Sequence, residues 1–405
     1  MEKGVIEGIF DNIISNYVLI APLILVYFLE KFLKNQSEDK AKQRQDYDKL
    51  SEKYYKENLI ERPIREGDKE KDKTKYYPIA DLGCCDICIY TSEDEILKTP
   101  QIEIKDSHEF YELPNILAVS FTKIMSAHDT STVFNAVNIR AKDMEIQDGR
   151  LLMSTERTLY FYSLVANRAP DFEWDGNTVR ELYEPGPFLQ PLKYSTLSNH
   201  IGFNGFVESE DGYIVFMKRK GNVSVGKRTI GCSIEASLKA KYGLDEEGSF
   251  TPETLVNAIL QEIDDELGIC REELKDVRLI GAYRNLVECG KPQLLFCARS
   301  NQKMQELTDQ FFSSLKTKKG NGREAEKRMQ TDGAELIWIR SKDLDNVQFM
   351  ESSINAASCE TSYYKKGKKN NLRETNLRMV PSSAASLLLF SKYRNKEYIA
   401  NEATE

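Results

Sequence analysis

The chain has 405 residues, of which 40% are hydrophobic and 30% are charged, and its formal net charge is −8. This length predicts more than one domain, and the hydrophobic fraction is sufficient for globular cores. The acidic balance argues against nucleic-acid binding through a broad basic surface, so no nucleic acid is expected as a partner.

Residues 13–29 contain no charged side chain. A charge-free span of this length reaches the lower limit for crossing a bilayer. A cleaved signal peptide would need a basic leader and a small-residue cleavage site, and a buried soluble helix would not be expected ahead of so charged a segment. We therefore predict an N-terminal segment at residues 1–12 and one transmembrane helix at residues 13–33, through which the chain binds the membrane.

Basic residues are asymmetric about this span: Lys3 precedes it, whereas Lys31, Lys34, Lys40, Lys42 and Arg44 follow it. By the positive-inside rule, the asymmetry predicts a single-pass protein with its folded domains on the cytoplasmic side. Residues 34–75 are dominated by charged side chains and are interrupted by Pro63 and Gly67. They are predicted to form a charged helical stalk followed by a linker.

Residues 76–192 are predicted to form a small α+β domain ahead of a larger one. Residues 101–105, 137–146 and 151–161 have β-favouring patterns, and Asp148 and Gly149 suit a tight turn between the last two strands. Residues 115–125 and 160–167 are ambiguous between helix and strand.

Eight cysteines in a chain of this length do not form a dense disulfide framework, and a reducing cytosol is the default compartment. Cys84, Cys85 and Cys88 form one cluster, but no second pair follows at zinc spacing and no histidine is near enough in the sequence to complete a local site. Free thiols are therefore favoured over a metal site.

Residues 193–405 are predicted to form the main domain. Its expected order is a hairpin, a strand that ends in glycine, a helix, three strands and a closing helix, at residues 201–207 with 213–219, 226–231, 252–267, 277–283, 292–299, 335–340 and 381–393. His200, at the start of the first strand, is interpreted as structural. Two basic runs, at residues 316–323 and 363–371, are predicted to be polar loops, with capture of an anionic ligand as the functional alternative.

The helix at residues 252–267 carries the clearest local signals. Thr251 is a candidate N-cap, Pro252 suits the first turn, and Gly268 suits the end of the helix. An apolar stripe recurs every four residues, at Leu255, Ile259, Ile263 and Leu267. These patterns predict an amphipathic helix with one face buried.

Three carboxylates, Glu262, Asp265 and Glu266, are spaced i, i+3 and i+4 and so cluster on one flank of this helix. Carboxylates held this close repel one another unless a cation lies between them. Hard oxygen donors suit Mg²⁺ or Mn²⁺, which also bind substrate phosphates. The alternative is a solvated acidic flank with no ligand.

Residues 261–269, QEIDDELGI, resemble the second half of the Nudix box, G-x5-E-x7-R-E-U-x-E-E-x-G-U, in which U is a bulky aliphatic residue. Glu253 lies at the position of the isolated glutamate. The chain departs from the pattern at three positions: Gln261 replaces the arginine, Asp265 is shorter than the usual glutamate, and Glu247 replaces the glycine.

A second alignment takes Gly231 as the glycine of the box and treats residues 236–250 as an insertion. We prefer this alignment because a strand that ends in glycine lets the backbone approach metal and phosphate. Residues 148–205 are also similar to the leader of some bacterial Nudix-like proteins of unassigned activity.

The resemblance implies a Nudix-like α/β/α sandwich with a mixed sheet, and a hydrolase that cleaves a diphosphate linkage in a nucleoside diphosphate derivative. It implies that Glu262, Asp265, Glu266 and the carbonyl of Gly231 hold Mg²⁺ or Mn²⁺. Glu262 and Glu266 would be catalytic, and Glu288 is the candidate general base. Lys227 and Arg228 would meet the substrate phosphates.

Three hypotheses therefore stay open. The first is a membrane-anchored pyrophosphohydrolase with a nucleotide-type substrate. The second is a catalytically weak Nudix-like module that senses a nucleotide at the membrane, which the departures at Gln261 and Asp265 favour. The third places the function in residues 76–192 and makes the Nudix-like half a dimerising scaffold; a homodimer is frequent among similar proteins.

Overall fold

The computed structural model describes residues 75–78, 86–89, 102–128, 135–147, 150–186, 189–218, 229–316, 335–346, 349–350 and 353–402. All of them belong to one compact unit, Tyr47–Glu405. The predicted N-terminal segment, transmembrane helix and nearly all of the stalk lie outside the described residues, as do Lys227 and Arg228. Within the described ranges, no helix has both the length and the hydropathy needed to cross a bilayer.

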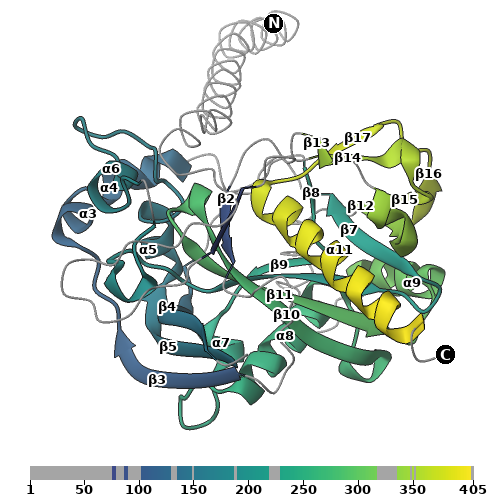
Figure 1. Ribbon diagram of the computed structural model, residues 1–405, viewed down its shortest axis with the longest axis horizontal. Helices are drawn as coiled ribbons and strands as arrows, with labels where there is room; N and C mark the ends of the chain where they lie inside the picture. Colours follow the sequence, from purple (N-terminus) through teal and green to yellow (C-terminus); the bar gives the residue numbers. More distant parts are fainter. Residues whose placement is uncertain are drawn as a thin grey trace, which may run out of the picture. The chain divides into compact units, whose positions relative to one another are not determined.

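The described chain belongs to the α+β class and contains mixed sheets (Figure 1). Its first part contains β1 (Lys75–Pro78), β2 (Asp86–Ile89), β3 (Ile102–Phe110), α3 (Asn115–Val119), α4 (Phe121–Met125), β4 (Val137–Gln147), β5 (Arg150–Leu159), α5 (Tyr160–Val165) and α6 (Val179–Tyr183). The ambiguous residues 115–125 and 160–167 are thus mainly helical. Because α5 begins at Tyr160, the strand predicted to end at residue 161 ends at Leu159.

The second part contains the predicted elements in their predicted order, with the unpredicted β9, α7, α9 and β13 to β17 inserted between them. It contains β6 (Gly202–Glu208), β7 (Tyr213–Lys218), β8 (Ile230–Gly231), β9 (Ile234–Ser237), α7 (Ala240–Gly243), α8 (Pro252–Leu267), β10 (Leu274–Asn285), β11 (Lys291–Ser300), α9 (Met304–Lys316), β12 (Glu335–Arg340), β13 (Phe349–Met350), β14 (Ser353–Asn355), β15 (Thr361–Lys365), β16 (Lys368–Asn370), β17 (Asn376–Arg378) and α11 (Pro381–Glu402). Short 3₁₀ turns lie at Ser126–His128, Leu192–Tyr194, Arg271–Glu273, Leu286–Glu288, Ser341–Asn346 and Ala356–Ser358.

The main sheet has the strand order β1-β2-β10-β11-β6-β7-β12-β15-β16, with β8 paired to β7 and β9 paired to β6. The pair β11 and β6 is parallel, whereas the other pairs are antiparallel, so the sheet is mixed. A smaller sheet has the order β3-β5-β4, and β13, β14 and β17 form a third. In the smaller sheet, β3 runs parallel to β5.

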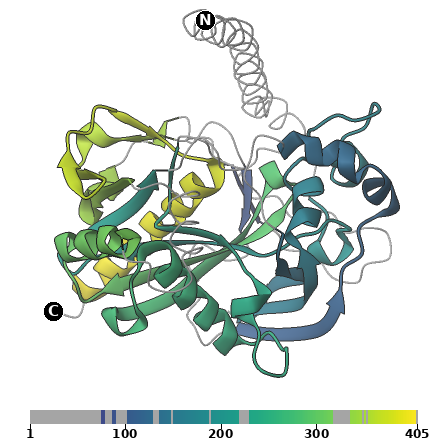
Figure 2. The ribbon, with the colours of Figure 1, turned by 180° about the vertical axis from the view of Figure 1, so that it is seen from behind.

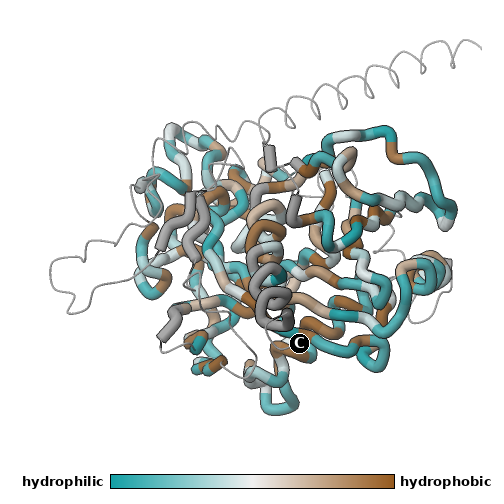
Figure 3. Tube along the Cα trace, turned by 45° about the vertical axis from the view of Figure 1, so that its right-hand side comes forward, coloured by the Kyte–Doolittle hydropathy of each residue, from teal (hydrophilic) through white to brown (hydrophobic). Residues whose placement is uncertain are grey.

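The main sheet is buried on two faces, because side chains alternate between them along each strand. Phe203 of β6 and Phe296 of β11 belong to a core that also contains the apolar residues of α8 and α9. Phe206 and Leu295, from the same two strands, belong to a second core with α11. Figures 1 and 2 show α11 and α8 on opposite sides of the sheet. Hydrophobic residues concentrate in these inner strands and helices (Figure 3).

The core beneath α8 also draws side chains from the predicted leader region. Ile139, Leu151 and Met153 of β4 and β5 are buried together with Phe203 and Leu255 from beyond residue 192. The boundary at residues 192 and 193 stays a prediction, but the two stretches that it separates share one apolar core. The leader strands therefore help to position α8.

The prediction of a polar loop at residues 363–371 was wrong. These residues form most of the hairpin of β15 and β16, with the turn at Lys366 and Gly367, whose φ angles are 52° and 76°. Tyr364 is 4% exposed, and β15 pairs with β12. The tyrosines favour a strand that packs against the sheet, and this preference outweighs the basic composition of the run. The other basic run, at residues 316–323, lies outside the described residues except for Lys316.

Candidate functional site

Helix α8 begins and ends where the local sequence predicts. The Thr251 hydroxyl accepts a hydrogen bond from the Thr254 amide at 3.3 Å, and the Thr254 hydroxyl accepts one from the Thr251 amide at 2.8 Å. Pro252 occupies the first turn, and Gly268 ends the helix in the left-handed region, with φ 72°. The predicted apolar stripe, Leu255, Ile259, Ile263 and Leu267, is buried.

The loop that leads into α8 is held by a buried ion pair between β3 and β5. The Arg157 guanidinium donates to both carboxylate oxygens of Asp106, at 2.7 and 2.6 Å. Asp106 also accepts from the Phe250 amide at 2.9 Å, and Arg157 donates to the Gly248 carbonyl at 2.7 Å. Burial raises the pKa of Asp106, but the hydrogen bonds from Arg157, Phe250 and Thr155 outweigh burial and leave its pKa below the usual value.

Glu262, the first carboxylate of the acidic triplet, is buried at 2% exposure. Its Oε1 accepts a short hydrogen bond from the ammonium of Lys239, which lies just ahead of α7. Burial lowers the pKa of Lys239, but the charge and hydrogen bond of Glu262, together with the charges of Glu266 and Asp265, leave its pKa above the usual value. One lysine therefore lies in the field of all three carboxylates.

Asp265 has two polar partners of its own. Its Oδ2 accepts from the Tyr242 hydroxyl at 2.5 Å, and its Oδ1 accepts from the Gln261 amide nitrogen at 3.0 Å. Gln261, which stands where the Nudix pattern has arginine, thus orients a carboxylate without adding positive charge. The ring of Tyr242 also faces the Lys239 ammonium, 5.4 Å from the ring centroid.

Glu266 points toward β9 and toward Glu235, a residue that the sequence analysis did not single out. The Glu235 amide donates to Glu266 Oε2 at 3.4 Å, and the Glu235 carboxylate accepts from the Cys232 amide at 2.9 Å and from the Ser383 hydroxyl. A Cβ at Gly231 would lie 2.9 Å from that carboxyl group, so a larger residue there would require the Glu235 side chain to shift.

The two alignments of the Nudix box place their residues differently. The Glu235 amide contacts Glu266 on the acidic flank of α8, and Gly231 lies against the Glu235 carboxyl group, whereas Glu253 is exposed in the first turn of that helix. Gly231 is thus linked to the acidic flank through Glu235. The choice between the two alignments stays a prediction.

The carboxylate oxygens of this neighbourhood are donors of the type that hard cations bind, although their observed arrangement does not converge on one point. The Lys239 ammonium contacts Glu262 and lies within the electrostatic field of Asp265 and Glu266, so the acidic flank of α8 already has a positive charge supplied by the protein. Across the described ranges, no three His, Cys, Asp or Glu side chains come close enough together to hold a metal ion. With Lys239 in its observed position, Glu262 Oε1 is directed at the ammonium.

Glu288, the candidate general base, belongs to a different cluster. Its carboxylate lies 3.4 Å from Arg168 Nε and 3.6 Å from Lys291 Nζ, and it accepts from the Asn285 amide at 3.4 Å. Burial raises its pKa, but the charges of Lys291 and Arg168 outweigh burial and lower it. Burial also lowers the pKa of Lys291 to about 8. A carboxylate held by two cations is a poor proton acceptor, so this pairing favours a structural role.

His200 is fully buried, as a structural histidine would be. Its Nε2 lies 3.0 Å from the Ser237 hydroxyl, and its Nδ1 has no hydrogen-bond partner among the described residues. Burial and the charges of Lys291 and Arg168 hold the pKa of His200 well below its usual value. The imidazole is therefore neutral at physiological pH.

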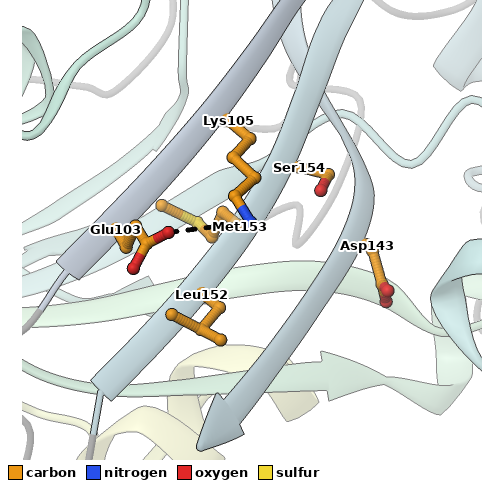
Figure 4. A pocket seen from close by; sticks show the side chains of 6 residues that line it. All are labelled: Glu103, Lys105, Asp143, Leu152, Met153 and Ser154. Atoms are coloured by element: carbon orange, nitrogen blue, oxygen red, sulfur yellow. Dashed lines mark ion pairs between the residues drawn. The ribbon is translucent and has the colours of Figure 1, made fainter.

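A small pocket lies on the sheet β3-β5-β4 rather than beside α8 (Figure 4). It is lined by Glu103, Lys105, Asp143, Leu152, Met153 and Ser154. Lys105 and Glu103 form an ion pair at 3.7 Å, and their side chains are 79% and 50% exposed. The cavity volume of about 70 Å³ is too small for a nucleotide, which needs several hundred Å³.

Cys232, Cys270, Cys289, Cys297 and Cys359 form no disulfide bonds. Of the cluster predicted from the sequence, Cys88 lies in β2, and Cys84 and Cys85 lie outside the described residues.

Neither a protein-family model nor a curated protein matches this chain. Among solved structures, the chain is similar to one described as DR0079 from Deinococcus radiodurans, with 15% sequence identity and a TM-score of 0.20. The aligned part covers 26% of this chain and 57% of that chain. At this TM-score, the similarity supports no argument about fold or function.

Proposed function

We propose that this chain is a Nudix-type hydrolase that cleaves a diphosphate linkage in a nucleoside diphosphate derivative. The observation that carries the proposal is the acidic flank of α8, on which Glu262, Asp265 and Glu266 lie together in the field of the Lys239 ammonium. The box-like sequence at residues 261–269 and the placement of the sheet between α8 and α11 support a Nudix-like α/β/α sandwich for residues 193–405.

Each residue of the flank has a role in this proposal. Glu262, Asp265 and Glu266 would hold Mg²⁺ or Mn²⁺, and Gly231 would bring its backbone carbonyl close because no side chain intervenes. Gln261 and Tyr242 orient Asp265 through its two oxygens. When bound, the metal supplies Lewis acidity to the diphosphate and to the attacking water.

Lys227 and Arg228 lie close to Gly231 in the sequence and outside the described residues, and their contact with substrate phosphates stays a prediction. Anchoring by residues 13–33, with the folded part on the cytoplasmic side, and homodimer formation are further proposals that come from the sequence. The loops that would recognise the base and sugar carry no signal specific to one nucleotide.

A second candidate function is a nucleotide-binding sensor with little or no hydrolysis. The ion pair between Lys239 and Glu262 favours it, because a permanently paired Glu262 would not be available to a metal. Gln261 favours it as well, since it orients Asp265 but adds no positive charge. The two candidates make different predictions about turnover.

The test is turnover of a panel of nucleoside diphosphate derivatives by the full-length chain with Mg²⁺ or Mn²⁺, measured as release of nucleoside monophosphate. Glu262→Gln should abolish turnover, whereas Glu253→Gln, which changes an exposed residue of the same helix, should leave it unchanged. Ligand binding without turnover in the wild-type protein would establish the sensor. Equal activity of Glu262→Gln and wild type would remove Glu262 from the mechanism.

A further inference from the structure

We propose that Lys239 is a built-in counter-cation that competes with the divalent metal for the acidic flank of α8. The site is then closed while the ammonium pairs with Glu262 and opens when the lysine side chain moves away. This inference rests on the proposed function in that it takes Glu262, Asp265 and Glu266 to be ligands of a divalent cation. It adds a regulatory contact that the resemblance to the Nudix box does not imply.

The geometry places the Lys239 ammonium at the carboxylate that a metal would need. Its Nζ donates to Glu262 Oε1, and the Glu262 side chain is only 2% exposed. Water therefore has little access to this carboxylate, and Lys239, which is 21% exposed, is the member of the pair nearer to solvent. The ammonium is a compact charge on a flexible stem, so it can occupy a cation position without any change in the backbone.

Contacts with neighbouring residues position Lys239, but its side chain retains access to solvent. Its ammonium faces the ring of Tyr242, and the hydroxyl of that residue binds Asp265. The backbone of Lys239 is tied to β4 through a bridge to Asn138. Yet its side chain is 21% exposed, against 2% for Glu262, so the lysine is the partner with a path into solvent.

Competition follows from the charges. A divalent ion bound to Glu262, Asp265 and Glu266 would lie beside the Lys239 ammonium. Two adjacent cations repel strongly where solvent screening is weak. Metal binding must therefore displace Lys239. A residue that only oriented Glu262 would have the opposite effect, because its loss would misplace the carboxylate and weaken metal binding.

The experiment measures Mn²⁺ binding to the full-length chain by electron paramagnetic resonance, without nucleotide. Lys239→Gln removes the charge and keeps a hydrogen-bond donor; we expect its Mn²⁺ dissociation constant to fall at least tenfold relative to wild type. Lys275→Met is the matched control, because Lys275 pairs with Glu210 at 3.1 Å on a half-exposed surface. Its dissociation constant should equal that of the wild-type protein.

Lys239→Arg provides a second test if Lys239→Gln fails to fold. A guanidinium can hold the carboxylate through two hydrogen bonds, so this variant should bind Mn²⁺ more weakly than wild type. Unchanged or weaker binding in Lys239→Gln, or stronger binding in Lys239→Arg, would overturn the inference. So would the absence of Mn²⁺ binding from both wild type and Lys239→Gln.

Failure of the proposed function gives a different result. If Lys239→Gln binds Mn²⁺ at least tenfold more tightly and neither protein hydrolyses any nucleotide, Lys239 is the competing cation of a sensor. If both hydrolyse nucleotides and their Mn²⁺ affinities are equal, the hydrolase stands and the competition does not.

Discussion

Replacement of Arg157 by leucine should loosen the entry of α8 and strongly destabilise the protein. In the native structure, the Arg157 guanidinium makes two short hydrogen bonds to Asp106 and one to the Gly248 carbonyl. Asp106 also accepts a hydrogen bond from the Phe250 amide, two residues before α8 begins. The variant leaves the Asp106 carboxylate buried and without its cation.

The size of the expected loss of stability in Arg157→Leu follows from the burial of the ion pair. Both side chains of the Asp106–Arg157 pair are 5% exposed, and removal of one partner from a buried ion pair costs about 3–5 kcal/mol. Lys123 and Asp175 form a pair with the same N–O distance, 2.6 Å, but their side chains are 61% and 62% exposed. Solvent screening leaves such an exposed pair worth about 0–1 kcal/mol.

The assay is thermal unfolding, followed by the fluorescence of Trp174 and Trp338, which are 5% and 1% exposed. At roughly 2 °C per kcal/mol for a chain of this size, Arg157→Leu should lower Tm by about 6–10 °C and Lys123→Met by at most about 2 °C. Equal shifts in the two variants would refute the claim that burial decides the strength of these pairs. Full rescue of Arg157→Leu by a second substitution, Asp106→Asn, would confirm that the uncompensated charge causes the loss.

Three further predictions concern single positions. Thr251→Ala removes the N-cap of α8 and should lower the free energy of unfolding by about 1 kcal/mol, as measured by urea unfolding, whereas Thr251→Ser should retain most of it. Gly205→Ala would place a Cβ 2.0 Å from the ring of Phe296, so the folded fraction seen by circular dichroism should fall, and a compensating Phe296→Leu should restore part of it. The pKa of Lys291 is about 8 in the folded protein and about 10.4 in an unfolded chain. Between these values the unfolded chain binds more protons, so this lysine makes stability rise with pH. Urea unfolding should show that the free energy of unfolding rises less between pH 8 and pH 10 in Lys291→Met than in the wild-type protein. An equal rise in both proteins would show that other groups cause the pH dependence.

Helix α8 could be predicted from the sequence because its signals are local. Thr251, Pro252 and Gly268 act on backbone groups within one turn of themselves, and the apolar stripe requires only that some core cover it. The hairpin of β15 and β16, which contains most of the basic run at residues 363–371, could not be predicted from composition. Its strand formed because Tyr364 is buried and β15 pairs with β12, both of which depend on elements distant in the sequence.

The candidate site divides in the same way. The sequence by itself determined that three carboxylates lie on one flank of a helix, since helical periodicity places positions i, i+3 and i+4 together. Only the tertiary structure decided which groups face them: Lys239 pairs with Glu262 from 23 residues away, and Glu235 lies beside Glu266. Only folding, likewise, placed Glu288 between Arg168 and Lys291. The charge partners of a carboxylate depend on how separate strands and loops pack, and no local periodicity encodes that packing.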